Sequence, residues 1–131
     1  MHSLRPGIIV LLLTSTFWLA CNHKPAQQSS AGVHTIQPNE VAAVMEKEQA
    51  VLLDVRTPEE VAAGVIAGTS LFADIKSPDF EQKIAALDKN KAYIVYCRSG
   101  ARSSQAAQYM LSKGFTRIYN LEGGILNWPA P

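Results

Sequence analysis

The sequence has few cysteines and few histidines, and this scarcity excludes several classes of small protein. Its 131 residues include only two cysteines, Cys21 and Cys97, which allow one disulfide at most and therefore no disulfide framework. The three histidines, at positions 2, 23 and 34, do not stand at metal-ligand spacing with cysteine or carboxylate residues. We therefore expect no metal site.

Neither sign of charge predominates. Lysine and arginine together number 12, and aspartate and glutamate together number 11. No stretch of lysine and arginine forms a basic stripe, and no aromatic residues alternate with one. Nucleic-acid binding depends on positive charge that matches the phosphate backbone, so we expect no nucleic-acid partner.

The chain has no apolar run long enough for a comfortable membrane span, which needs about 20 residues. Positions 7–20 carry no charge, follow Arg5 and end in a small residue, as in a secretory signal peptide. Leu19-Ala20-Cys21 resembles the end of a bacterial lipoprotein signal. The resemblance implies that residues 1–20 are removed, that Cys21 is lipidated, and that a periplasm-facing membrane holds the exported protein. A plain signal peptide with a chance cysteine, or an uncleaved anchor, is the alternative.

The segment that begins at Cys21 differs in composition from the rest of the chain. Residues 21–32 are mostly polar, are rich in glutamine and serine, and include Pro25 and Gly32, as in a flexible linker. Residues 33–131 mix apolar and polar residues as globular domains do, and their number suffices for one core that folds alone. We expect a single domain over 33–131 that is a monomer.

Apolar runs alternate with helical patterns through this domain. The runs at 50–55 and 92–96 are almost entirely apolar, as in strands buried on both faces. Thr57, Pro58 and Glu60 form a helix start with a capping box, and Gly114 is placed to end a helix over 103–113. Further strands are predicted at 33–36, 69–72 and 116–121, and further helices from Pro38, from Ser77 and after Gly123-Gly124. The alternation predicts an α/β fold, with a five-stranded parallel sheet and helices on both faces.

The run Cys97-Arg98-Ser99-Gly100-Ala101-Arg102-Ser103 stands where such a fold forms its sites. Cys97 directly follows the strand predicted at 92–96, and ligands bind outside the carboxyl ends of parallel strands. Gly100 can take a left-handed conformation, and a tight turn points backbone N–H groups inward as an anion nest. This nest, the positive end of the next helix, Arg98 and Arg102 favour a thiolate. We therefore expect the pKa of Cys97 to lie below about 8.5, with no histidine base in the motif.

A thiolate beside an anion nest predicts a definite chemistry. A thiosulfonate carries a negative group next to a transferable sulfur. Attack by Cys97 on that sulfur would release sulfite and leave a persulfide, whose charge the same N–H groups hold. The alternative is that Cys97 is an inert residue buried at a strand end. Two arginines and a glycine around it favour the reactive cysteine.

The same run resembles the active-site loop of rhodanese-type sulfurtransferases. Leu53-Asp54-Val55-Arg56, followed by Glu60 and then by Gly64-Val65-Ile66-Ala67-Gly68, is similar to the early motif of that family. Gly114-Phe115, followed by Tyr119 to Ile125 and by Trp128, is similar to its closing motif. The resemblance covers about 36–128, which is essentially the whole predicted domain. It implies a parallel α/β sheet, a persulfide intermediate, and neither metal nor cofactor.

Carried over residue by residue, the resemblance implies that Cys97 is the nucleophile. Arg98 and Arg102 then bind substrate or set the charge of the loop, and the backbone N–H groups of Ser99 to Ser103, with Gly100 and Ala101 between them, form the cradle. Asp54 and Arg56 resemble a pair that braces the loop, and a purely structural ion pair is equally compatible with them. The expected partners are a small sulfur donor such as thiosulfate and a thiol or cyanide acceptor.

Two positions depart from the family pattern. Val65 and Ala67 stand where the family often has histidine and proline. Both are predicted in a turn away from the cysteine loop. We therefore expect changed packing rather than lost activity.

Two other functions are compatible with a cysteine in an anion-binding loop. Cysteine phosphatases and arsenate reductases place an arginine where this sequence has Ser103, one residue beyond Arg102. The loop is therefore one residue too short to surround a phosphate well. A tethered persulfide-relay or binding module with little turnover on free substrate is the other alternative, and the sequence leaves it open.

Overall fold

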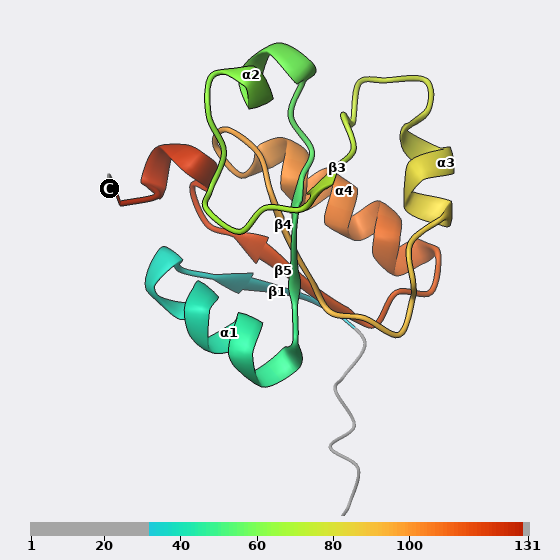
Figure 1. The fold of residues 1–131 in the computed structure, drawn as a ribbon. Coiled ribbons are helices and arrows are strands. Elements are labelled where there is room, and N and C mark those ends of the chain that lie inside the picture. Colours follow the sequence, from blue (N-terminus) through green and yellow to red (C-terminus); the bar gives the residue numbers. More distant parts are fainter. Residues whose placement is uncertain (1–31, 130–131) are drawn as a thin grey trace, which may run out of the picture.

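The computed structural model describes residues 32–129, which form one α/β unit (Figure 1). The expectations for the signal peptide, for lipidated Cys21 and for most of the linker lie outside the described residues. No helix within 32–129 is long and apolar enough to cross a membrane. The elements are, in chain order, β1 (Gly32–Ile36), the 3₁₀ turn η1 (Pro38–Glu40), α1 (Val41–Glu48), β2 (Val51–Asp54), α2 (Pro58–Ala62), β3 (Leu71–Phe72), α3 (Phe80–Ala85), β4 (Tyr93–Tyr96), α4 (Ala101–Ser112), β5 (Arg117–Leu121) and the 3₁₀ turn η2 (Gly124–Asn127).

The five strands form one sheet in the order β1-β5-β4-β2-β3, and every neighbouring pair is parallel. The predicted fold class is confirmed. Strand β4 lies at the centre, and all four of its residues are buried. Because all strands run in one direction, their carboxyl ends share one edge of the sheet, and the segments that follow β2, β4 and β5 meet there.

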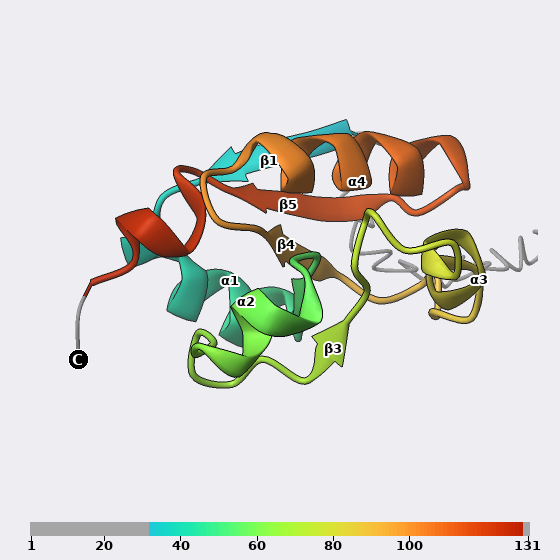
Figure 2. The same ribbon diagram turned by 90° about the horizontal axis from the view of Figure 1, so that it is seen from above.

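Helices cover both faces of the sheet (Figure 2). On one face, Phe80 and Ile84 of α3 and Met110 of α4 pack against alternate strand residues such as Val95. On the other face, α1 packs over a second cluster that includes Ile94 and Tyr96. This alternation along β4 is the two-residue period of a strand, and it explains why the run at 92–96 is continuously apolar.

Helix α2 begins at its predicted sequence signal. Thr57 Oγ1 accepts a hydrogen bond from the backbone N–H of Glu60, and the Glu60 carboxylate accepts one from the N–H of Thr57. This is the predicted capping box at the start of α2. The helix predicted from Pro38 begins instead as a 3₁₀ turn and becomes α-helical at Val41. Strand β1 begins at Gly32, one residue earlier than predicted, so Gly32 belongs to the sheet and not to the linker.

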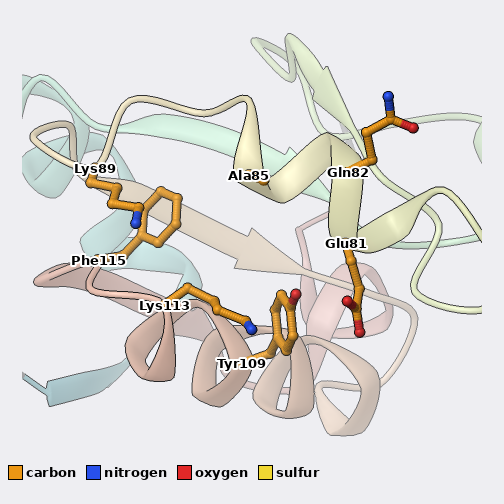
Figure 3. A pocket seen from close by; sticks show the side chains of 7 residues that line it. All are labelled: Glu81, Gln82, Ala85, Lys89, Tyr109, Lys113 and Phe115. Atoms are coloured by element: carbon orange, nitrogen blue, oxygen red, sulfur yellow. The ribbon is translucent and has the colours of Figure 1, made fainter.

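A hollow of about 380 Å³ separates α3 from the second half of α4 (Figure 3). Phe115 and Lys89 in its wall precede β5 and β4, so the hollow lies at the amino ends of the strands. The Lys113 ammonium lies 5.1 Å from the centre of the Tyr109 ring in the same wall. Cys97 follows the carboxyl end of β4, and the hollow is therefore separate from the cysteine loop.

Candidate active site at the carboxyl edge of the sheet

Cys97 lies where the sequence predicts it, immediately after β4 at the carboxyl edge of the sheet. Its side chain has no exposed surface. Gly100 takes the predicted left-handed conformation, with φ of 98°, and acts as the N-cap of α4. The helix begins at Ala101, two residues earlier than predicted. Its first turn, with backbone N–H groups that have no partner within the helix, therefore belongs to the loop around the sulfur.

Hydrogen bonds from this loop converge on the Cys97 sulfur. The backbone N–H of Gly100 donates to Sγ over 3.1 Å, and the Ser103 hydroxyl lies 3.5 Å from it. Burial raises the pKa of Cys97, whereas hydrogen bonds from the Ser103 hydroxyl and from the backbone of Ser103, Gly100 and Ser99 lower it. The hydrogen bonds outweigh burial, so the pKa of the thiol lies below its ordinary value, and the thiolate is favoured.

The two loop arginines differ in their surroundings. Arg98 is exposed. Arg102 forms a bidentate ion pair with Glu60 of α2, and both N···O distances are 2.7 Å. The pKa of Glu60 falls from 4.5 to about 2, chiefly because Arg102 hydrogen-bonds its carboxylate. We expected Arg102 to contribute a free positive charge, but Glu60 balances much of that charge in the structure.

Asp54 and Arg56 form the predicted pair, and both are buried. The guanidinium of Arg56 donates to Asp54 Oδ1 and Oδ2 over 2.7 to 3.0 Å. It also donates to the backbone carbonyls of Glu60 and Gly64 over 3.3 and 2.7 Å. Arg56 therefore ties the end of β2 to the middle of α2 and to Gly64 just beyond that helix, and Glu60 of α2 pairs with Arg102. The pair is linked to the cysteine loop through Glu60 and Arg102, and its bracing of that loop stays a prediction.

The 3₁₀ turn η2 holds the loop from the other side. The backbone N–H groups of Ile125 and Leu126 donate to the carbonyls of Cys97 and Arg98 over 2.9 and 3.1 Å. With these carbonyls held by η2, the N–H groups of the following residues are left to face the sulfur. Gly124 makes this approach possible, because a Cβ atom there would lie 2.5 Å from the Cys97 carbonyl oxygen.

Asn120 is a site residue that the sequence reasoning did not single out. It lies in β5, is 7% exposed, and its Oδ1 lies 2.6 Å from the Ser103 hydroxyl. Ser103 is itself fully buried. A polar residue at a buried position of a predicted strand is a signal that could have identified Asn120. Glu60 was predicted as a capping residue and as part of the early family motif, but its pairing with Arg102 was not predicted.

The described residues offer no ready metal site. Within 32–129, no three histidine, cysteine, aspartate or glutamate side chains lie close enough together to hold a metal ion. The site thus consists of a buried cysteine, a ring of N–H donors, one hydroxyl and an ion pair at the rim.

A family model described as the rhodanese-like domain matches residues 37–130. The chain belongs to the rhodanese-like domain family.

Several relatives of known name share this rhodanese-like domain. A sulfurtransferase of Allochromatium vinosum is 38% identical over 81 residues, which cover 62% of this chain and 73% of that protein. The thiosulfate sulfurtransferase GlpE of Stutzerimonas stutzeri is 38% identical over 91 residues, with 70% of this chain and 81% of that protein covered. A crystal structure of a rhodanese-related protein from Thermoplasma volcanium superimposes with a TM-score of 0.62 at 28% identity, over 72% of this chain and 89% of that one. These relatives support a sulfurtransferase of the rhodanese type.

Val65, which stands where the family often has histidine, lies on the surface of this rhodanese-like domain. Val65 is 41% exposed and lines a shallow hollow together with Arg56, Glu60 and Trp128. The backbone N–H of the next residue, Ile66, donates to the buried hydroxyl of Tyr96 over 3.2 Å. The turn is therefore fixed by the β4 residue that precedes Cys97, which gives it a firmer connection to the site than the sequence suggests.

Proposed function

We propose that this protein moves sulfane sulfur from thiosulfate, or a related small donor, to cyanide or a thiol through a persulfide on Cys97. The observation that carries the proposal is the environment of the Cys97 sulfur. The sulfur is buried and accepts a hydrogen bond from the backbone N–H of Gly100 over 3.1 Å, and the hydrogen bonds around it lower the pKa of the thiol. Such an environment stabilises first the attacking thiolate and then the negative terminal sulfur of a persulfide.

The proposed reaction has two steps. In the first, the Cys97 thiolate attacks the outer sulfur of thiosulfate, the S–S bond of the donor breaks, and sulfite leaves with the bonding electron pair. In the second, cyanide attacks the terminal sulfur of the persulfide, forming thiocyanate and regenerating the thiolate. The buried position of the sulfur favours small donors, since a bulky one cannot approach without opening the loop.

The direct test is intact mass spectrometry of the protein before and after treatment with thiosulfate. We expect the mass to rise by one sulfur atom and to return to its starting value when cyanide is added. Cys97→Ser should abolish the rise, whereas Ser112→Ala, a change at the far end of α4, should leave it intact. Absence of the added sulfur in the wild-type protein would refute the persulfide, and a rise that survives in Cys97→Ser would move the chemistry to another residue.

Thiocyanate formation under the same conditions separates an enzyme from a relay module. Continuous turnover with thiosulfate and cyanide supports the sulfurtransferase. A protein that loads sulfur on Cys97 but turns over poorly with free acceptors would instead be a persulfide relay that delivers sulfur to a partner.

We further propose that the protein is an exported lipoprotein whose Cys21 carries the lipid that holds it at a periplasm-facing membrane. The proposal rests on the residues before Cys21 alone, namely Arg5, the uncharged stretch at 7–20 and Leu19-Ala20-Cys21. Intact mass of the native protein would show the mature chain beginning at Cys21 with acyl groups attached. A native protein that keeps residues 1–20, or begins at Cys21 without acyl groups, would contradict it.

A further inference from the structure

Three acceptors surround the single hydroxyl proton of Ser103. Its Oγ lies 2.6 Å from Asn120 Oδ1, 3.1 Å from the carbonyl oxygen of Gly100 and 3.5 Å from Cys97 Sγ. A serine hydroxyl donates one hydrogen bond at a time. The hydroxyl proton that can stabilise negative charge on the sulfur is therefore the same proton that forms the hydrogen bond to Asn120. The two hydrogen bonds exclude each other.

The amide of Asn120 can take either role toward Ser103. In the arrangement of the structure, its carbonyl oxygen accepts from the hydroxyl. Rotation of the amide by half a turn brings the NH₂ group to the same place, because the two ends of an amide have nearly the same shape. Asn120 then donates to Ser103 Oγ, and the hydroxyl proton is free to turn to the sulfur.

We propose that Asn120 is a positioning residue that decides, through Ser103, whether Cys97 Sγ receives a hydroxyl hydrogen bond. While Cys97 is a thiol, Ser103 donates to the Asn120 carbonyl. When Cys97 becomes a thiolate, the amide turns and Ser103 donates to the sulfur. The consequence for sulfur transfer rests on the proposed function, but the hydrogen-bond exchange itself depends only on the charge of Cys97.

Few other groups can compete with this exchange. Asn120 and Ser103 are 7% and 0% exposed, so bulk water does not easily replace either partner. The charged group that faces Cys97 is Arg102, which is paired with Glu60 from α2. Strand β5 presents the uncharged Asn120. The one internal competitor is the carbonyl of Gly100, which captures the Ser103 proton if Asn120 no longer donates.

The test is a double-mutant cycle read by the pH dependence of Cys97 alkylation with iodoacetamide, without any sulfur donor. Asn120→Leu and Ser103→Ala should each raise the pKa of Cys97 by about one unit, which is an about ten-fold loss of alkylation rate at pH values below that pKa. The double variant should match Ser103→Ala, since Asn120 acts only through Ser103. Tyr119→Phe, from the same strand but on the opposite face of the sheet, should leave the profile unchanged.

The proposal is overturned if Asn120→Leu leaves the pKa of Cys97 unchanged or lowers it, or if the two single effects add in the double variant. If Asn120→Leu does not fold, Asn120→Ala makes the same comparison with a smaller side chain. Persulfide loading by thiosulfate is measured separately on each variant. Wild-type protein that alkylates as expected but takes up no sulfur would refute the proposed function while leaving the role of Asn120 standing.

Discussion

At the scale of single residues, two opposing effects act on the Cys97 sulfur. Burial of the side chain opposes the thiolate, and the hydrogen bonds from the Ser103 hydroxyl and from the backbone of Ser103, Gly100 and Ser99 favour it. Hydrogen bonds to an ionised group are about twice as strong as those between neutral groups, which is why a few of them outweigh full burial. Because Arg102 is paired with Glu60, activation depends more on backbone geometry than on the charge of the loop.

Gly124 provides a residue-scale test of that geometry. A Cβ atom at this position would lie 2.5 to 2.6 Å from backbone atoms of Cys97 and Arg98, so Gly124→Ala must push the loop away from η2. We expect about 2–4 kcal/mol lower stability and an about hundred-fold slower loading of Cys97 with sulfur. Urea unfolding and mass spectrometry after timed exposure to thiosulfate would measure the two effects.

Gly68→Ala is the matched control, because Gly68 also has a positive φ, of 88°, but nothing lies within 3.4 Å of its added methyl group. Strain at the backbone should cost about 1–2 kcal/mol there and leave sulfur loading unchanged. Equal losses of loading in both variants would show that η2 does not hold the cysteine loop.

At the scale of elements, the sequence predicts each strand and helix but misplaces ends where tertiary contacts override local signals. Ser103 is a favoured helix cap, and a start at 103 follows from local preference; the structure begins α4 at Ala101 because Gly100 takes the left-handed capping conformation. The strand predicted from Thr69 begins at Leu71, since Thr69 forms a turn with Ile66 and contacts the Tyr96 hydroxyl. Neither contact is visible in a local pattern.

Tyr96 ties this turn to β4, and its hydroxyl gives an element-scale prediction. The hydroxyl accepts from the N–H of Ile66 over 3.2 Å and lies 2.9 Å from Thr69 Oγ1. Tyr96→Phe leaves the buried N–H of Ile66 without a partner, and we expect a loss of about 1–3 kcal/mol in the free energy of unfolding.

Tyr93→Phe is the comparison, because Tyr93 is equally buried and its hydroxyl donates to the carbonyl of Asp88 over 2.9 Å. A carbonyl has two lone pairs and is more easily satisfied by water, so this variant should lose clearly less. Urea unfolding of both proteins measures the difference. If Tyr93→Phe is the more damaging change, the Tyr96 hydroxyl does not anchor the turn.

At the scale of the whole molecule, a local ion pair and an ion pair between distant segments act together at the carboxyl edge of the sheet. Asp54 and Arg56 lie two residues apart at the end of a predicted strand, and their pairing follows from the motif. Glu60 and Arg102 lie 42 residues apart, and only the pairing of β2 with β4 in the sheet brings α2 beside the first turn of α4. Local reasoning therefore found the support at the end of β2 but not the link from α2 to the cysteine loop.

The Glu60–Arg102 pair makes the stability of the molecule depend on pH in acid. Because the pKa of Glu60 is about 2 in the folded protein and 4.5 ordinarily, its contribution is complete above pH 4.5 and is lost as the pH falls toward 2. Glu60→Gln should therefore lower the free energy of unfolding by about 1–2 kcal/mol at neutral pH and by much less near pH 2, where about half of the wild-type Glu60 side chains are also protonated. Glu59→Gln removes a charge from the same helix turn without touching Arg102, and urea unfolding across this pH range compares the two variants. A Glu60→Gln deficit that stays constant between pH 7 and pH 2 would assign its effect to the capping of α2 instead of to the ion pair.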